Sequence, residues 1–392
     1  MQITDKKIED KIPPLLRLGF RPFFLLGSVY ALCIVPLWVW MFQTGQSLSL
    51  QVPPLWWHAH EMLFGFGMAI VAGFTLTAVQ TWTGIAGTKS KRLGVLVGIW
   101  IVVRLMFWLP VPLWLTSSVE ALFLLLLAYE MGFRVIKAKG YKNLFFIPLI
   151  LLAIGVNFAS YATIKGMPPF TSSAIWQAML WWFMLLISIM GARVIPFFTA
   201  RRFEFTKAQP KLWLDFAANL PLLLLMVLSF FPLQTELTRY VLIIGGGFGL
   251  LRMLRWRGWV SIREPLVWSL HLAFACLPLA MLWKGLSGNA LVVHHLTHLL
   301  AIGALTGVIL AMISRVTMGH TGRQIYQGPK MGLAYTLLFL AALIRGVLVG
   351  YFPAQMMLWI NLAAMCWVIS FGFYLKYFAP MLCRPRPDGH PG

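Results

Sequence analysis

The sequence predicts an all-α, polytopic membrane protein with about twelve transmembrane helices. Of its 392 residues, 60% are hydrophobic and 11% are charged, whereas a soluble domain is about 45–50% apolar and about 25% charged. A transmembrane helix takes roughly 20 apolar residues, so twelve of them leave room only for short loops. The composition therefore excludes a large soluble domain, and we expect residues 1–392 to form a single transmembrane domain in a lipid bilayer.

Twelve apolar runs are long enough to be membrane spans. They lie at about 20–42, 56–80, 93–110, 112–135, 143–163 and 171–198, and then at about 212–230, 237–252, 265–284, 290–315, 331–349 and 355–378. The eighth is the weakest of them, because the glycines at 245–247 interrupt a segment that is already short. The polar N-terminal segment has no cleavable signal pattern, so we expect the first span to be retained.

The basic residues separate onto one predicted side of the membrane. Loops after the even-numbered spans are rich in Lys and Arg, whereas loops after the odd-numbered spans carry Lys165, Arg239 and Lys284. With the two tails included, 26 of the 32 basic residues fall on one side and 3 on the other. The positive-inside rule then places that side, and both termini, in the cytoplasm.

The net charge of +21 follows from this topology, so nucleic acid is not an expected partner. A nucleic-acid-binding protein would gather its basic residues on one folded surface. The four cysteines show no C-x-x-C or C-x-x-C-H spacing, which gives no support to a disulfide framework, an iron–sulfur cluster or covalently attached haem.

Three spans start at a regular interval. The second, sixth and tenth begin near residues 56, 171 and 290, and all three run inward. This spacing suggests three four-helix pseudo-repeats, like those of haem–copper oxidase catalytic subunits. The alternative is that this regular spacing arises by chance, because the sequence is built mostly from a few apolar residue types.

Five of the eight histidines form two groups. His58 and His60 open the second span, and His294, His295 and His298 lie near the start of the tenth. Both spans enter the membrane from outside, which puts both groups at a similar depth. Ionisable side chains at membrane depth are costly and usually functional, so we predict that these histidines bind metal rather than serve as structural hydrogen-bonding residues.

The spacing within each group constrains that site. His294 and His298 are four residues apart and share a helix face, as the two histidines of H-E-x-x-H zinc sites do, while His295 points about 100° away. His58 and His60 differ by about 200° and cannot both face one metal. One of His58 and His60 could therefore sandwich a haem with a histidine of the tenth span, and the remaining imidazoles could bind copper.

Three charged residues could assist this centre. Arg104 and Arg345 lie in the outer halves of the third and eleventh spans and are candidates to pair with haem propionates. The alternative is a snorkelling or glutamate-paired arginine. Glu61 follows His60 directly and is a candidate proton relay.

A second group of polar residues lies on the cytoplasmic side. Arg193 and Arg315 close the sixth and tenth spans, His320 follows, and His271 starts the ninth span. A second metal site formed by these four residues is a hypothesis, and simple anchoring of the helix ends is the alternative.

Five stretches resemble the NnrS family of bacterial membrane proteins. They are PLLRLGFRPFF (14–24), WHAHEMLFGFG (57–67), GFTLTAVQTWTG (73–84), RVIPFFT (193–199) and MISRVTMGHTGR (312–323). The resemblance implies a twelve-helix protein of the inner membrane that contains haem and copper and is linked to tolerance of nitrosative stress. We therefore expect copper and a non-covalent, b-type haem as cofactors.

The leading hypothesis is a haem–copper protein that binds or turns over nitric oxide. Reduction of nitric oxide would require an external electron donor such as quinol or a cytochrome. A secondary transporter is the rival, since twelve spans with inside termini are common among transporters, although the loop at 83–92 lacks the acidic-and-arginine motif of the major facilitator group. A non-catalytic sensor that uses the same sites is the third hypothesis.

We predict that a reporter fused in the loop at Gln46–Gln51 will report the outside of the membrane, because the basic residues assign this loop to that face. Alkaline phosphatase and green fluorescent protein fusions measure this directly. A cytoplasmic signal from this loop would refute the topology.

Overall fold

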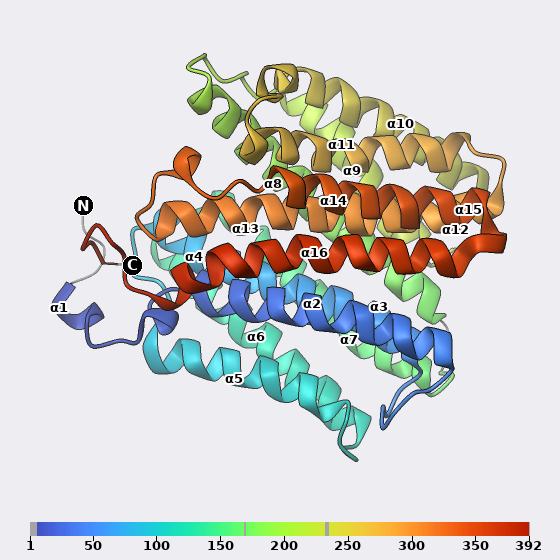
Figure 1. Cartoon of the computed structure of the whole chain (residues 1–392), viewed down its shortest axis with the longest axis horizontal. Coiled ribbons are helices and arrows are strands. Elements are labelled where there is room, and N and C mark those ends of the chain that lie inside the picture. The colour runs from blue at the N-terminus through green and yellow to red at the C-terminus, as the bar shows by residue number, and fades with distance from the viewer. Residues whose placement is uncertain (1–5, 168–169, 232–234, 392) are drawn as a thin grey trace. The chain divides into compact units, whose positions relative to one another are not determined.

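Most of the described part of the chain is helical. The computed structural model describes residues 6–167, 170–231 and 235–391, and over these residues it contains helices and turns but no β-strand (Figure 1). In the same residues, nine helical segments are long and apolar enough to cross a membrane. The predicted all-α, polytopic fold class is confirmed.

Each of the twelve predicted spans contains a helix. In chain order these are α2 (Phe20–Thr44), α3–η2–α4 (Pro54–Thr83), α5 (Ser90–Met106), α6 (Leu113–Lys137), α7 (Phe146–Ile164), α8 (Ser172–Arg202), α9 (Leu212–Leu228), α10 (Thr235–Leu254), α11 (Pro265–Leu286), α12–η5–α13 (Ala290–His320), α14–η7–α15 (Gly332–Tyr351) and α16 (Met356–Cys383). The shortest are α5 and α9, with 17 residues each. These two helices and α6 (Leu113–Lys137) are the three that lie outside the nine long apolar segments named above.

Three π-helical segments interrupt these spans in the described part of the chain. They are η2 (Glu61–Gly67), η5 (Leu299–Thr306) and η7 (Ile344–Leu348). A π-helical turn has i→i+5 hydrogen bonds and frequently marks a functional site. Here η2 follows His60, η5 follows His298 and η7 contains Arg345, so each segment adjoins a residue that the sequence singled out.

The contacts divide the chain into two compact units, and each is described by itself. The first unit comprises Met1–Trp176, Val316–Gly328 and Leu375–Gly392, and the second comprises Gln177–Arg315 and Pro329–Tyr374. The predicted single domain and the three pseudo-repeats remain predictions.

In the first unit, the start of α2 is held by two sets of hydrogen bonds. The Phe20 N–H donates to Thr77 Oγ1 at 2.9 Å. The fully buried Arg21 donates from Nη1 to the carbonyl oxygens of Leu382 and Arg384, both at 2.8 Å. A cation at a helix C-terminus satisfies carbonyls that have no partner within the helix, so Arg21 ties α2 to the end of α16.

In the second unit, the glycines at 245–247 serve packing. A Cβ at Gly245 would lie 2.5 Å from Met281 Cε, and one at Gly246 would lie 2.9 Å from the Pro278 carbonyl oxygen. The missing side chains let α10 approach α11 closely. The helix keeps a length of 20 residues, so the glycines do not shorten this span.

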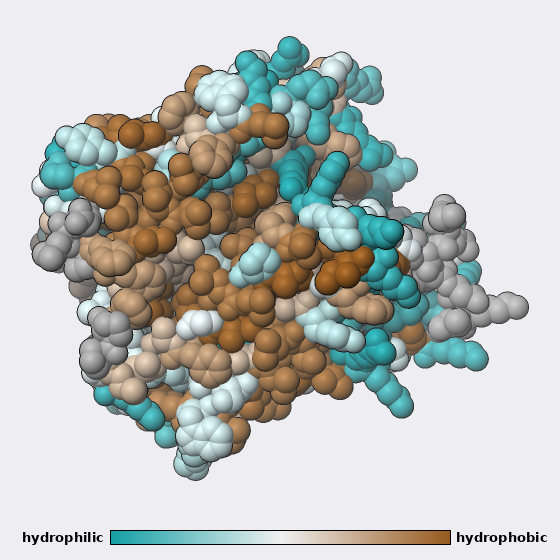
Figure 2. Space-filling view, turned by 180° about the vertical axis from the view of Figure 1, so that it is seen from behind, coloured by the Kyte–Doolittle hydropathy of each residue, from teal (hydrophilic) through white to brown (hydrophobic). Residues whose placement is uncertain are grey.

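The exterior is suited to lipid. Along α6, Leu122, Leu125, Tyr129 and Phe133 are exposed, and their spacing of three and four residues places them on one helix face. Figure 2 shows mostly hydrophobic side chains over much of one face, with hydrophilic side chains towards its margins.

We predict that Gly346→Ala destabilises the protein by about 1–3 kcal/mol, the usual cost of overpacking. A Cβ at Gly346 would lie 2.7 Å from the Leu299 backbone nitrogen, so η7 and the start of η5 would have to separate. The measurement is thermal unfolding of the purified protein in detergent.

Gly372→Ala is the matched control, because nothing lies within 4 Å of a Cβ at this helical glycine. We expect it to leave stability unchanged or to raise it by about 0.5–1 kcal/mol, since alanine favours a helix more than glycine does. Equal melting temperatures for the two variants would contradict the close packing at Gly346.

Candidate functional site

The two predicted histidine groups belong to different units. His58 and His60 lie in the first unit, and His294, His295 and His298 lie in the second. The predicted haem sandwich would take one ligand from each unit, and it stays a prediction.

In the first unit, His60 is the centre of a fully buried ionic network. The end of α3 and the start of η2 place His60 beside Glu61, and His60 Nδ1 lies 2.7 Å from Glu61 Oε1. On the other side of the ring, His60 Nε2 lies 2.9 Å from Glu120 Oε2. Both ring nitrogens therefore face a carboxylate.

Arg104 joins the same two carboxylates. Its Nε lies 3.2 Å from Glu61 Oε2, and its Nη2 donates to Glu120 Oε1. Of the two interpretations of Arg104, the structure contains the glutamate-paired one. Pairing with a haem propionate stays a prediction.

Two tyrosines complete the network. Tyr30 of α2 donates its hydroxyl hydrogen to Glu61 Oε2, and Tyr161 of α7 donates to Glu120 Oε2 at 3.4 Å. Residues from α2, α3, η2, α5, α6 and α7 thus meet at one point within the first unit. Such a convergence of polar groups inside membrane-spanning helices is a mark of function.

Aromatic side chains and one glycine enclose the network. Trp56 and Phe64 stack on the His60 ring, with centroids 4.7 and 5.1 Å away. A Cβ at Gly65 would lie 2.9 Å from both Arg104 Nη1 and Glu61 Oε2. Gly65 therefore leaves the space that the guanidinium and the carboxylate occupy, which explains why this motif has a glycine here.

The formal charges of the network indicate how many protons it can carry. Two carboxylates and one guanidinium sum to −1, and an excess charge in a dry interior is costly. One proton on the imidazole makes the network neutral and allows both ring nitrogens to donate to carboxylate oxygens. The network is thus built to carry one exchangeable proton, which is compatible with the predicted relay role of Glu61.

This geometry bears on metal binding by His60. A metal ligand needs a nitrogen lone pair, and one of the two carboxylate contacts would have to break to provide it. The His58 ring stacks on Trp38 of α2, with centroids 4.1 Å apart. That His58 and His60 cannot both face one metal stays a prediction.

In the second unit, α12 (Ala290–His298) carries the other three histidines. His294 is exposed and His295 is buried, with their ring centroids 5.2 Å apart. Arg345 Nη1 lies 2.9 Å from His295 Nδ1. Because a guanidinium only donates, Nδ1 must accept, and the proton of a neutral His295 lies on Nε2.

The donor chemistry fits haem and copper in part. Imidazole suits both metals, and His294 and His298 keep the four-residue spacing on one helix. Contacts to charged groups occupy both ring nitrogens of His60 and one of His295. In the described residues, no group of three or more His, Cys, Asp or Glu side chains is arranged to hold a metal ion.

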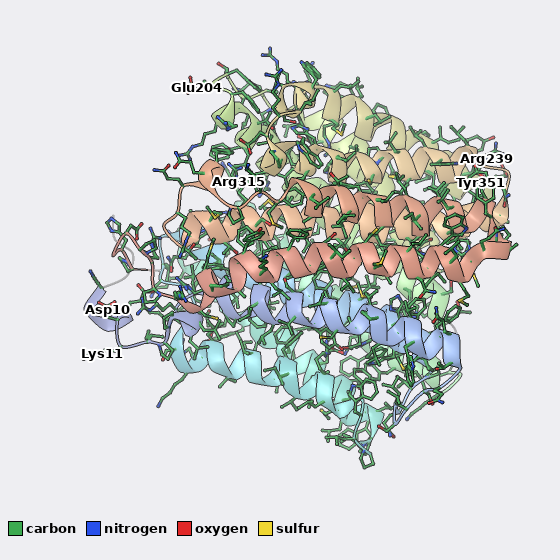
Figure 3. The ribbon with its side chains drawn as sticks, viewed as in Figure 1. Asp10, Lys11, Glu204, Arg239, Arg315 and Tyr351 are labelled. Carbon is green, nitrogen blue, oxygen red and sulfur yellow. The ribbon has the colours of Figure 1, made fainter. Side chains whose placement is uncertain are left out.

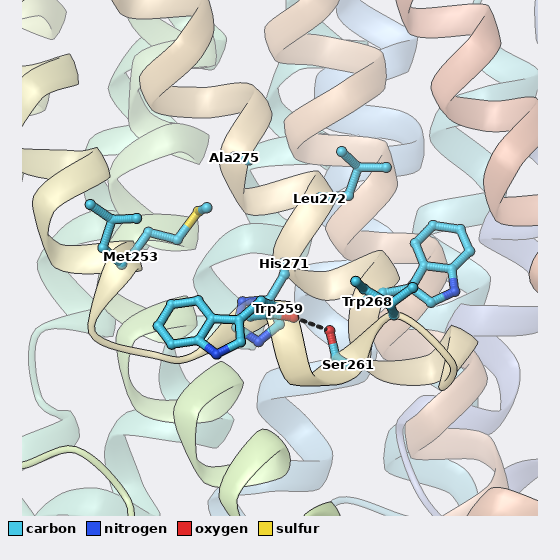
Figure 4. Close-up of a pocket in the computed structure, with 10 residues that line it drawn as sticks. Met253, Trp259, Ser261, Trp268, His271, Leu272 and Ala275 are labelled. Carbon is cyan, nitrogen blue, oxygen red and sulfur yellow. Dashed lines mark hydrogen bonds between the residues drawn. The ribbon is translucent and has the colours of Figure 1, made fainter.

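The residues of the predicted second site also fall into both units. In the second unit, His271 Nε2 lies 2.8 Å from Thr199 Oγ1, and the Arg315 guanidinium lies 3.7 Å from the centre of the Phe198 ring. Arg193 is exposed. His271 borders an apolar pocket with Trp259, Trp268 and Ser261, whose hydroxyl donates to the Gly258 carbonyl oxygen (Figure 4).

His320 lies in the first unit beside Phe20, at a centroid distance of 5.6 Å. Arg386 donates to the His320 carbonyl oxygen at 3.2 Å and to Asp388 at 2.6 Å. The hydrogen bond from Arg386 to the Asp388 carboxylate lowers the pKa of Asp388 to about 2. The arrangement anchors the chain that follows α16, and a metal site at His320 stays a prediction.

Glu120, Tyr30 and Tyr161 were missed by the sequence analysis. Glu120 could have been found, because it is an acidic residue within the apolar run of the fourth predicted span. Tyrosines give no such signal.

A polytopic helical membrane protein with a buried ionic network is the class that fold and site define. Comparison with known families is more specific. The NnrS protein family matches residues 14–386, nearly the whole chain, so the chain belongs to this family. No curated protein matches the chain. Family membership supports a role in the nitric oxide response.

We predict that Glu120→Gln destabilises the protein by about 1–3 kcal/mol, the usual cost of a buried donor left without an acceptor, because the amide NH2 group faces the N–H groups of Arg104 or His60. The variant keeps the side-chain shape but leaves Arg104 and His60 with one carboxylate between them. Thermal unfolding in detergent measures the effect.

Glu236→Gln provides the comparison, because Glu236 is an exposed partner of Arg239 at 4.0 Å. An exposed pair contributes about 0–1 kcal/mol. If both variants melt alike, the network does not stabilise the first unit.

Proposed function

We propose that this protein binds haem and copper in the bacterial inner membrane, binds nitric oxide there, and reduces it, which protects the cell against nitrosative stress. Membership of the NnrS family is the observation that carries the proposal. The histidines on α3 and α12 support it, because they supply imidazole ligands within membrane-spanning segments.

His294 and His298 are the residues of α12 that we propose as primary metal ligands, since their helical spacing suits chelation. His58 is the candidate from α3. When bound, a ferrous haem with an open position supplies a binding site for nitric oxide, and copper supplies a second, Lewis-acidic one.

The exterior and the network suit this substrate. Nitric oxide is small and apolar, so it can reach a buried site from the lipid past the exposed hydrophobic side chains. Two nitric oxide molecules, two electrons and two protons give one nitrous oxide and one water. We propose quinol or a cytochrome as the electron donor and Glu61, within its hydrogen-bonded network, as a proton relay.

The proposed orientation follows from the basic loops. Both termini face the cytoplasm, and the two histidine groups lie towards the outer side. This orientation places the metal centre in reach of donors on the outer side and of quinol in the bilayer.

We predict that the purified, haem-replete protein shows a Soret absorption band and, when reduced under anaerobic conditions, converts nitric oxide into nitrous oxide. His294→Ala and His298→Ala should each lower the rate at least about tenfold, because loss of a ligand impairs metal binding. Gas chromatography of nitrous oxide measures turnover, and the spectrum measures haem content.

His390→Ala is the control, since His390 is exposed in the C-terminal segment. Binding of nitric oxide without product would make the protein a sensor. Absence of a Soret band after haem-replete expression would reject haem binding and favour a secondary transporter, for which a buried ionic network in membrane spans is also typical.

A further inference from the structure

Arg104 and Arg345 occupy matching places in the two units. Each lies on the span that follows a histidine-bearing span, and each contacts that span close to a π-helical segment. Arg104 reaches Glu61 at 3.2 Å, and Arg345 reaches His295 at 2.9 Å. The two units thus place an arginine in the same position relative to a histidine-bearing span but give it different partners.

The two arginines differ in how their charge is balanced. Arg104 contacts two carboxylates, those of Glu61 and Glu120. The residue after His295 is the buried Leu296, where the residue after His60 is Glu61. The described contacts of Arg345 include no carboxylate, and the imidazole that accepts its hydrogen bond is uncharged. A guanidinium inside a membrane span is costly without a negative partner.

A second cation contacts the same helix as Arg345 does, α12. Lys284 of α11 donates from Nζ to the Val293 carbonyl oxygen at 2.6 Å and to Thr297 Oγ1 at 3.1 Å. Both acceptors are uncharged, so the charge of Lys284 is also uncompensated. His294 lies within electrostatic reach of Lys284 and of Arg345.

The acidic residues of the second unit are engaged elsewhere or lie far away. They are Glu204, Asp215, Glu236 and Glu264. Asp215 pairs with Arg252, Glu264 with Arg202, and the exposed Glu236 with Arg239. Figure 3 shows Glu204 and Arg315 at one end of this unit and Arg239 and Tyr351 at the other. Lys284 and Arg345 lie towards the Arg239 end, because Arg239 Nε donates to the Gly285 carbonyl oxygen at 2.9 Å and Arg345 is in the same helical span as Tyr351.

We propose that the second unit binds an oxyanion beside His294 and His295, with Arg345 as its principal cation and Lys284 as the second. A guanidinium has five N–H donors in a planar fork that suits carboxylates and similar planar oxyanions, and one of them is engaged with His295. The adjacent His294 is exposed at the surface of the unit. The inference rests on the charges of this unit and does not require haem.

The site is rigid before any anion binds. A Cβ at Gly346 would lie 2.7 Å from the Leu299 backbone nitrogen, so the adjacent Arg345 is carried on a backbone packed directly against η5. His295, one turn before Leu299, then fixes the guanidinium through Nδ1. Preorganised cations lose little freedom on binding, which favours affinity.

Two sources share this chemistry: a free oxyanion such as nitrite, and a carboxylate of a larger bound molecule such as a haem propionate. The test uses the purified full-length chain in chloride buffer and follows its melting temperature as sodium nitrite is added. The variants are Arg345→Met and Lys284→Met, with Arg239→Gln as the control cation at the same end of the unit.

We expect nitrite to raise the melting temperature of haem-free protein in a saturable way, and Arg345→Met to weaken this effect at least about tenfold, the loss typical of one charged hydrogen bond. Lys284→Met should weaken it less, and Arg239→Gln should leave it unchanged. No saturable effect in the haem-free wild type, or equal affinity in Arg345→Met, would overturn the proposal.

Haem-replete protein distinguishes the two sources. If nitrite no longer binds after haem loading, the natural anion is a propionate, and if it binds equally, the natural anion is a free ion. A second readout needs no ligand: without nitrite, Arg345→Met should melt at or above the wild type, whereas Arg104→Met should melt below it. An equal fall in both variants would show that Arg345 is already compensated.

Discussion

The free-energy cost of a charge inside a membrane span governs the polar interior of this protein. In the first unit, Arg104 contacts Glu61 and Glu120, and His60 lies against both carboxylates, so that one proton on the imidazole would balance the remaining negative charge. Every member of that network has a partner of opposite charge or a hydrogen bond, which is the condition under which buried ions are tolerated. In the second unit, Arg345 and Lys284 contact uncharged acceptors. The network around His60 is therefore neutral without a ligand once the imidazole is protonated, whereas the described contacts of Arg345 and Lys284 do not balance their charges.

Irregular helices and glycines make both arrangements possible. The segment η2 starts at Glu61, and η7 contains Arg345. The extra residue of a π-helical turn therefore changes the direction of side chains at the positions where these charged groups lie. Gly65 leaves room for the Arg104 guanidinium, and Gly346 lets η7 lie against Leu299. A Cβ at Gly65 or Gly346 would lie within 3 Å of these neighbours, so alanine at either position would force them apart.

The sequence was sufficient for the fold class and for the twelve helices, because apolar runs of about 20 residues are a strong signal. It located His60, Glu61, Arg104, His295 and Arg345 as polar groups in spans, and the structure pairs them as His60–Glu61–Arg104 and His295–Arg345. It could not assign these pairs, because contacts between helices depend on rotation and register, which periodicity does not fix. The π-helical segments have no sequence signature of comparable strength.

The contacts of the arginines and carboxylates also narrow the choice of metal ligands. A histidine that holds a metal through one nitrogen uses the other to donate a hydrogen bond. His295 accepts through Nδ1 from Arg345, and this is the opposite of what a ligand bound through Nε2 requires. His60 faces a carboxylate on each side and is best described as a proton-bearing group. In each unit, the histidine that contacts the network or the arginine is therefore suited to balancing charge. The better candidates for metal ligands are His58 within the first unit and His294 and His298 within the second.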